Sequence, residues 1–126
     1  MFGGTEARRR GKDRGQVAIE YLGFLPILLL LAVAGAQLGL AAYTAQQAGT
    51  AARAAARAAA DDNARSTPQQ AGRAAMSDWL ANDRRTHIDP ALFDDEAEAT
   101  VRVHIPSVVP GWDFGDVVKS ATMPVG

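Results

Sequence analysis

The residues with the clearest chemical potential lie near the start of the chain. Glu20 stands at the head of a long apolar run, and Gly15 precedes it by five residues, after five arginines and lysines. A carboxylate facing hydrocarbon costs on the order of a few kcal/mol unless a cation neutralises it. Cleavage after Gly15 would leave a cationic amine on Gln16, within one helical turn of Glu20. If the chain is cut there, the two charges could neutralise each other, and the pair would set helix register during assembly.

Two alternatives remain open for these residues. Glu20 can lie in the headgroup layer at the membrane edge and have no specific partner. A new N-terminal Gln16 can cyclise and lose its positive charge, which would remove the pairing. A Glu20→Ala variant tests the first alternative, because unchanged assembly would favour it.

A membrane-spanning helix is expected to carry these groups. No charged residue lies between Glu20 and Arg53. A helix from Tyr21 to Tyr43 would be about 35 Å long, which is enough to cross a bilayer. The two tyrosines lie near the ends of this run, where amphipathic rings are favourable.

The charge distribution predicts how the chain is oriented. Residues 1–15 carry a net charge of +3, so the positive-inside rule places them in the cytoplasm. We expect a cytoplasmic leader at 1–15, a single transmembrane helix at 16–45 and a small extracytoplasmic domain at 46–126. The protein would then reside in the cytoplasmic membrane.

Two features of the apolar run concern helix geometry and packing. Pro26 lies inside it and removes a backbone hydrogen bond, so a kink is expected near Leu22. Gly35 and Gly39 form a Gly-x-x-x-Gly pattern, which offers a smooth face to other helices. Such a pattern also arises by chance in a helix rich in alanine and glycine.

The rest of the chain predicts an α+β domain. The alanine-rich stretch 45–60 should continue the first helix, with Arg53 and Arg57 on one exposed face. Thr67 and Pro68 form a capping-box start for a second helix, with Gly72, Met76, Trp79 and Leu80 on its apolar face.

Alternating apolar residues predict two antiparallel strands, at 99–105 and 117–123. Between them lies a turn-rich segment with Trp112 and Phe114. These two rings are expected to plug the small core, although an exposed contact patch is the alternative. The linkers are expected at 61–66 and 85–90.

Composition excludes several classes of function. The 126 residues allow one small domain, and the region after Arg85 is acidic, so nucleic acid is not an expected partner. The chain has no cysteine, which excludes disulfides and thiolate metal sites. We expect no cofactor.

Catalytic or metal-binding function is also not expected. His87 is assigned to a polar loop and His104 to the solvent face of a strand, and their spacing to nearby carboxylates matches no known motif. The acidic run 94–96 lacks the interleaved ligands and the glycine of a calcium loop. The sequence therefore predicts neither a catalytic residue nor a metal ligand.

Residues 14–31 as a whole resemble the start of TadE-like proteins, the pseudopilins of tight-adherence (Flp) pilus systems. In that family a prepilin peptidase cuts after a glycine, leaving glutamate at the fifth mature position, an aromatic residue next and a proline six residues beyond the glutamate. Gly15, Glu20, Tyr21 and Pro26 fill these places. The resemblance implies a processing site at Gly15 and Gln16, and roles for Glu20 and Tyr21 in assembly and register.

The resemblance also implies a function and partners. The protein would be a structural minor pilin rather than an enzyme, with prepilin peptidase, other pilin-like subunits and the pilus assembly machinery as partners. The alternative is an ordinary secretory signal peptide or membrane anchor followed by an interaction domain. Signal peptidase sites would then be Ala32-Val33-Ala34 or Ala34-Gly35-Ala36.

Overall fold

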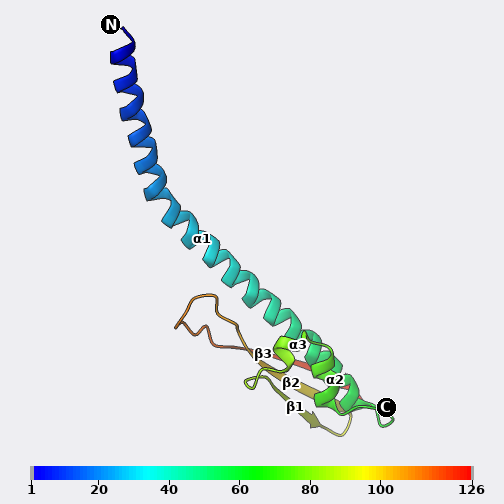
Figure 1. Cartoon of the computed structure of the whole chain (residues 1–126). Coiled ribbons are helices and arrows are strands. Elements are labelled where there is room, and N and C mark those ends of the chain that lie inside the picture. Colours follow the sequence, from blue (N-terminus) through cyan, green and yellow to red (C-terminus); the bar gives the residue numbers. More distant parts are fainter. Residues whose placement is uncertain (1, 126) are drawn as a thin grey trace. The chain divides into compact units, whose positions relative to one another are not determined.

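The computed structural model describes residues 2–125, with side chains from residue 15 onward. Three helices are followed by three strands, which confirms the predicted α+β class (Figure 1): α1 (Phe2–Ala60), α2 (Pro68–Ala74), α3 (Asp78–Ala81), β1 (His87–Leu92), β2 (Glu96–His104) and β3 (Asp116–Pro124). The chain divides into two compact units, Met1–Ala36 and Gln37–Gly126.

The first unit contains only α1. From Val17 to Leu31 its large apolar side chains are all exposed, on every side of the helix. A helix that is apolar all round must be covered by lipid or by other protein. Within the described residues, the stretch Gly15–Ala60 is the one helix long and apolar enough to cross a membrane.

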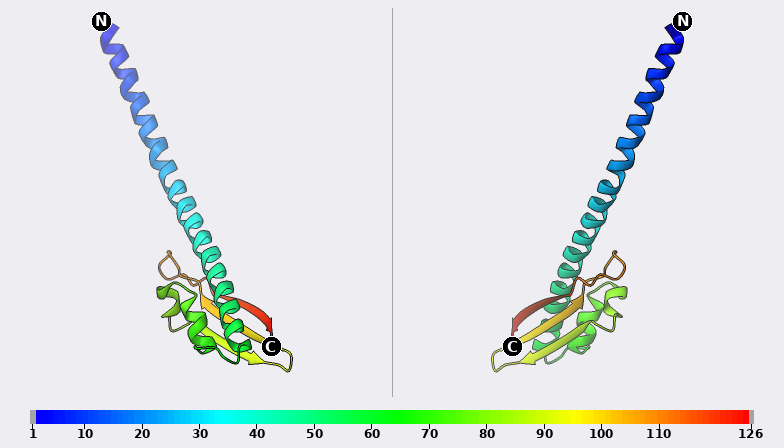
Figure 2. Two further views of the ribbon diagram at one scale, coloured as in Figure 1. Left: turned by 90° about the vertical axis from the view of Figure 1, so that its right-hand side faces the viewer. Right: turned by 90° about the vertical axis from the view of Figure 1, so that its left-hand side faces the viewer.

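The second unit is a sheet with a layer of helices on one face (Figure 2). The end of α1 contributes only small side chains to the interface, where Ala48, Ala51, Ala52, Ala55 and Ala56 are almost completely buried. Alanine both favours helix and lets the helix backbone approach the sheet closely. Arg53 and Arg57 are exposed, as predicted.

The sheet is antiparallel, with β2 in the centre. Ala97, Ala99, Val101 and Val103 of β2 are fully buried, so the predicted alternation is confirmed. β3 pairs with β2 from Asp116 opposite His104 to Pro124 opposite Glu96.

The other edge strand, β1, corrects the prediction of a linker at 85–90. It runs antiparallel to β2, from His87 opposite Arg102 to Leu92 opposite Ala97. His87 is therefore on a strand and not in a loop. Pro90 obscured the strand in the sequence, but proline is tolerated here because β1 is an edge strand.

The helix after the linker 61–66 begins as predicted. The Thr67 side chain accepts a hydrogen bond from the Gln70 backbone N–H, and the Gln70 side chain accepts one from the Thr67 backbone N–H, which completes the capping box. The prediction of one longer helix was wrong, because α2 ends at Ala74 and α3 begins after Ser77.

Contacts with α1 explain this break. The backbone N–H of Ser77 donates to Gln47 Oε1 at 2.8 Å, and the hydroxyl of Ser77 bonds to that of Tyr43. Trp79 was expected on the buried face, but it is 51% exposed and stacks on Tyr43 with ring centroids 6.1 Å apart.

Candidate functional site

The residues proposed for processing and assembly lie on exposed turns of α1. Gly15, Gln16, Glu20 and Tyr21 all have exposed surfaces. A shallow groove of about 420 Å³ runs beside Val17, Glu20, Tyr21 and Phe24. Within the first unit, the carboxylate of Glu20 is thus accessible to a partner group.

Pro26 and the two spaced glycines also lie in α1. α1 continues through Pro26 to Ala60 without a break. The kink near Leu22 stays a prediction. Gly35 and Gly39 are exposed, and a methyl group placed on either would meet no atom within 4 Å. No described residue therefore covers these two glycines.

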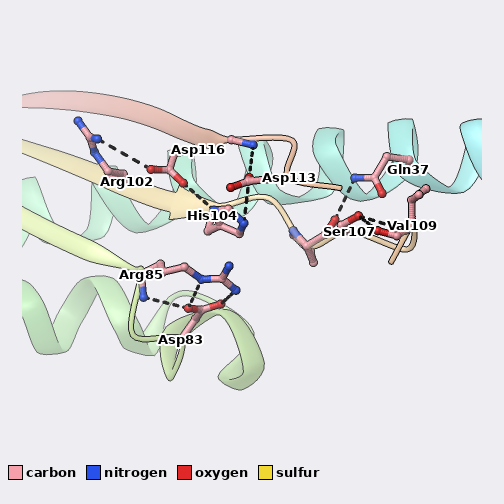
Figure 3. Close-up of polar contacts among 11 residues, drawn as sticks. Gln37, Asp83, Arg85, Arg102, His104, Ser107, Val109, Asp113 and Asp116 are labelled. Carbon is pink, nitrogen blue, oxygen red and sulfur yellow. Dashed lines mark hydrogen bonds and ion pairs between the residues drawn. The ribbon is translucent and has the colours of Figure 1, made fainter. Parts of the chain in front are cut away.

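A second candidate site lies in the compact unit 37–126, where α1 meets the β2–β3 loop (residues 105–115). Gln37 is only 7% exposed. Its Nε2 donates to the carbonyl of Pro106 at 2.9 Å (Figure 3). Its Oε1 accepts the backbone N–H of Val108 at 3.0 Å. One buried side chain thus satisfies both a donor and an acceptor of the loop.

The loop is also organised internally. The hydroxyl of Ser107 donates to the carbonyl of Val109 at 2.8 Å, and the backbone N–H of Trp112 donates to that same carbonyl at 3.2 Å. Gly111 and Gly115 have positive φ angles of 75° and 85°, which glycine adopts without strain. These contacts give the loop a defined conformation.

Trp112 and Phe114 do not plug the core, contrary to the expectation from sequence. Trp112 is 63% exposed and Phe114 is 38% exposed. Their rings stack on each other with centroids 5.8 Å apart and planes 14° apart. The two rings are therefore exposed and form a paired aromatic surface, and their role as a contact patch stays a prediction.

His104 lies between two aspartates where the loop rejoins the sheet (Figure 3). Its Nδ1 is 2.8 Å from Asp116 Oδ1, and its Nε2 is 3.4 Å from Asp113 Oδ1. His104 lies on the sheet face opposite the buried Val101 and Val103, as predicted, but its side chain is only 11% exposed. A ring with one proton can donate to one carboxylate, and a ring with two protons can donate to both.

Asp83 and Arg85 form an ion pair beside this cluster. Arg85 donates its side-chain Nε and its backbone N–H to Asp83 Oδ1, at 3.1 and 2.9 Å, and the side-chain bond is the main cause that lowers the pKa of Asp83. Hydrogen bonding to Asp83 raises the pKa of Arg85.

Arg85 lines an open depression of about 620 Å³ on the outer face of the sheet, together with Arg102, His104 and Asp116. Among the residues that the structure describes, no group of three or more histidines, cysteines or carboxylates is placed to hold a metal ion. The contacts instead tie the loop to the end of the sheet.

Sequence reasoning missed Gln37 and Tyr43 as tertiary contacts. Both lie in the run that was assigned to the membrane, where a glutamine is costly unless its amide is bonded. The polar side chain of Gln37 was the available signal, since it stands alone between Tyr21 and Tyr43.

Comparison with known proteins agrees with the resemblance seen in the sequence. Residues 15–57, about a third of the chain, match the family described as TadE-like protein. The match covers the exposed apolar part of α1 and most of its alanine-rich end. No curated protein and no solved structure matches the chain.

Proposed function

We propose that this chain, whose residues 15–57 match the TadE-like family, is a minor pilin or pseudopilin of a tight-adherence type pilus or a related secretion machine. The observation that carries the proposal is an exposed apolar helix headed by Gly15, Glu20 and Tyr21 inside the matched segment. The role is structural, and it depends on packing between helices.

The proposal assigns a function to each part of the chain. Residues 1–15 are a cytoplasmic leader that prepilin peptidase removes between Gly15 and Gln16. The membrane anchor lies within residues 16–45, of which 37–45 belong to the second compact unit, and residues 46–126 lie outside the cytoplasmic membrane. Other pilin-like helices then pack against the apolar segment.

Glu20 gives the assembly its register. After processing, the new amine on Gln16 neutralises the carboxylate of Glu20, on the same chain or on a neighbour. The exposed surface of Glu20 supports this role, because a partner can reach the carboxylate.

One structural observation favours a second candidate, a secreted interaction domain. The second compact unit begins at Gln37, directly after the possible signal peptidase site that ends at Ala36. A cut there would release this unit complete.

The N-terminus and mass of the protein recovered from membranes distinguish these candidates. The chain is expressed in cells with an active prepilin peptidase and in cells with an inactivated one. We expect a start at Gln16 only in the first. A start after Ala34 or Ala36 would support the secreted domain, and an intact Met1 in both strains would leave a plain membrane anchor. A Gly15→Ala variant is the matched control and should stay uncut.

A further inference from the structure

The β2–β3 loop carries apolar side chains that are exposed among the residues whose side chains the structure describes. Val108, Trp112 and Phe114 are 44%, 63% and 38% exposed. Residues 105–112 include no charged side chain. Burial of such rings is favourable, so an uncovered aromatic pair needs an apolar or interfacial environment.

The position of the loop indicates which environment that is. Gln37, which bonds to Pro106 and Val108, directly follows the exposed apolar segment in the chain. Figure 2 shows the loop at the end of the compact unit at which α1 enters it. The aromatic pair thus lies at the end of this unit nearest in sequence to the lipid-covered helix.

We propose that the β2–β3 loop is a membrane-interface anchor, with Trp112 and Phe114 in the headgroup layer of the bilayer that holds α1. The inference rests on the proposed membrane anchoring of α1. Tryptophan is the side chain best suited to this layer, since its ring is apolar and its indole N–H needs a polar partner. The ring of Phe114 adds apolar contact area.

The polar contacts of the loop fit this placement. Asp113, the first charged residue after the neutral stretch, accepts the backbone N–H of Gly115 at 2.8 Å and faces His104 at 3.4 Å. The Asp113 side chain is itself 75% exposed, so its carboxylate stays hydrated when the exposed ring of Trp112 lies in the headgroup layer. Gln37 at the membrane boundary is neutral, and both its amide nitrogen and its amide oxygen have a hydrogen-bond partner, so it costs little there.

The anchor also limits how deep α1 can insert. With the loop at the interface, Gln37 lies at the level of the headgroups, and the hydrocarbon-spanning part of α1 ends near Ala36. The span 16–45 expected from sequence is then too long at its outer end. A span from Val17 to Ala36 has about 20 residues, as a bilayer requires, with Glu20 as its one charged residue.

Fluorescence quenching in vesicles tests the inference on the full chain. Phosphatidylcholine vesicles contain lipids brominated either near the headgroup or deep in the acyl chains. A Trp79→Phe variant reports on Trp112 alone, and a Trp112→Phe variant reports on Trp79. Trp79 is the matched control, because its stacking partner Tyr43 lies six residues, or about 9 Å, beyond Gln37 along the helix.

A third variant of the chain reports on the depth of the α1 segment in the bilayer. Leu29, which is 66% exposed, is changed to tryptophan in a Trp79→Phe/Trp112→Phe background. We expect deep bromines to quench this tryptophan and shallow bromines to lower the emission of Trp112 about twofold, more strongly than that of Trp79.

The outcomes separate the two proposals. Quenching of Leu29→Trp without stronger quenching of Trp112 than of Trp79 would overturn the loop anchor and leave the membrane helix intact. Absence of quenching at Leu29→Trp would overturn the membrane anchor and the loop proposal with it.

Discussion

The side-chain carbonyl of Gln37 accepts the backbone N–H of Val108 at 3.0 Å, across 71 positions of sequence. The same side chain donates to Pro106, so a single residue of α1 holds the start of the β2–β3 loop. This contact links the end of the apolar segment to the aromatic pair that follows it in the loop.

Removal of the Gln37 amide should speed amide hydrogen exchange in the β2–β3 loop. In Gln37→Ala the Val108 N–H loses its acceptor, and a net hydrogen-bond contribution of about 1 kcal/mol corresponds to roughly fivefold faster amide exchange. Hydrogen exchange of a peptide covering 105–115, measured on the full chain in micelles, checks this. Leu38→Ala, at an exposed neighbouring position, is the control. Equal exchange in the two variants would contradict the role of Gln37.

Gly72 is predicted to be a packing residue. A methyl group there would lie 2.7 Å from Ile88 Cδ1 and 3.4 Å from Ala51 O, so Gly72→Ala should destabilise the compact unit by about 1 kcal/mol despite its better helix propensity. Unfolding followed by near-ultraviolet circular dichroism measures the change.

Two further variants make the Gly72 prediction specific. Ile88→Val removes the obstructing methyl, so Gly72→Ala/Ile88→Val should cost less than the sum of the single changes. Gly49→Ala is the control, because its added methyl would approach only Arg53 Nη1, at 3.9 Å. It should stabilise the protein, and additive costs in the double variant would contradict the packing argument.

The Asp83–Arg85 pair should make a small contribution to the pH dependence of stability. Because the folded-state pKa of Asp83 is lowered from 3.8, the contribution is present above the unfolded pKa and is lost as the pH falls through the folded value. Arg85→Gln should raise the midpoint of the Asp83 carboxyl titration, measured by NMR. Arg84→Gln, which removes no hydrogen bond to Asp83, should not. Equal midpoints in wild type and Arg85→Gln would rule out the assigned cause.

Glu20 is predicted to act through its charge. Both Glu20→Ala and Glu20→Gln should reduce incorporation of the protein into pilus assemblies, because neither can neutralise the amine of Gln16. Crosslinking to neighbouring subunits in membranes measures this incorporation. Glu20→Asp keeps the negative charge and should retain part of the incorporation. Unchanged crosslinking in Glu20→Ala would place Glu20 in the headgroup layer without a specific partner.

Gly35 and Gly39 are predicted to contact a neighbouring helix. Both positions have open space within the chain, so leucine at both should leave the fold unchanged and reduce crosslinking between subunits. Gly23→Leu is the matched control, since Gly23 lies on the same helix and is equally open. Full crosslinking in the Gly35→Leu/Gly39→Leu variant would show that these glycines do not form a packing face.

Local patterns by themselves determined much of this protein. The uncharged apolar run and the alanine-rich stretch predicted α1 to Ala60, the Thr67 capping box predicted the start of α2, and alternation predicted β2 and β3. These elements depend on neighbours a few residues away, so their signals lie in the sequence. The TadE-like motif at Gly15, Glu20 and Tyr21 is local in the same way.

Tertiary structure alone decided the features that depend on distant partners. β1 exists because it pairs with β2, although Pro90 weakens its own strand pattern. α2 and α3 separate because Ser77 bonds to Gln47 of α1. Trp112 is exposed because the core is formed by alanines of α1, by residues of the short helices and by the sheet, and does not include the loop. Hydrogen bonds and packing across tens of residues leave no periodic signal, so only the folded chain reveals them.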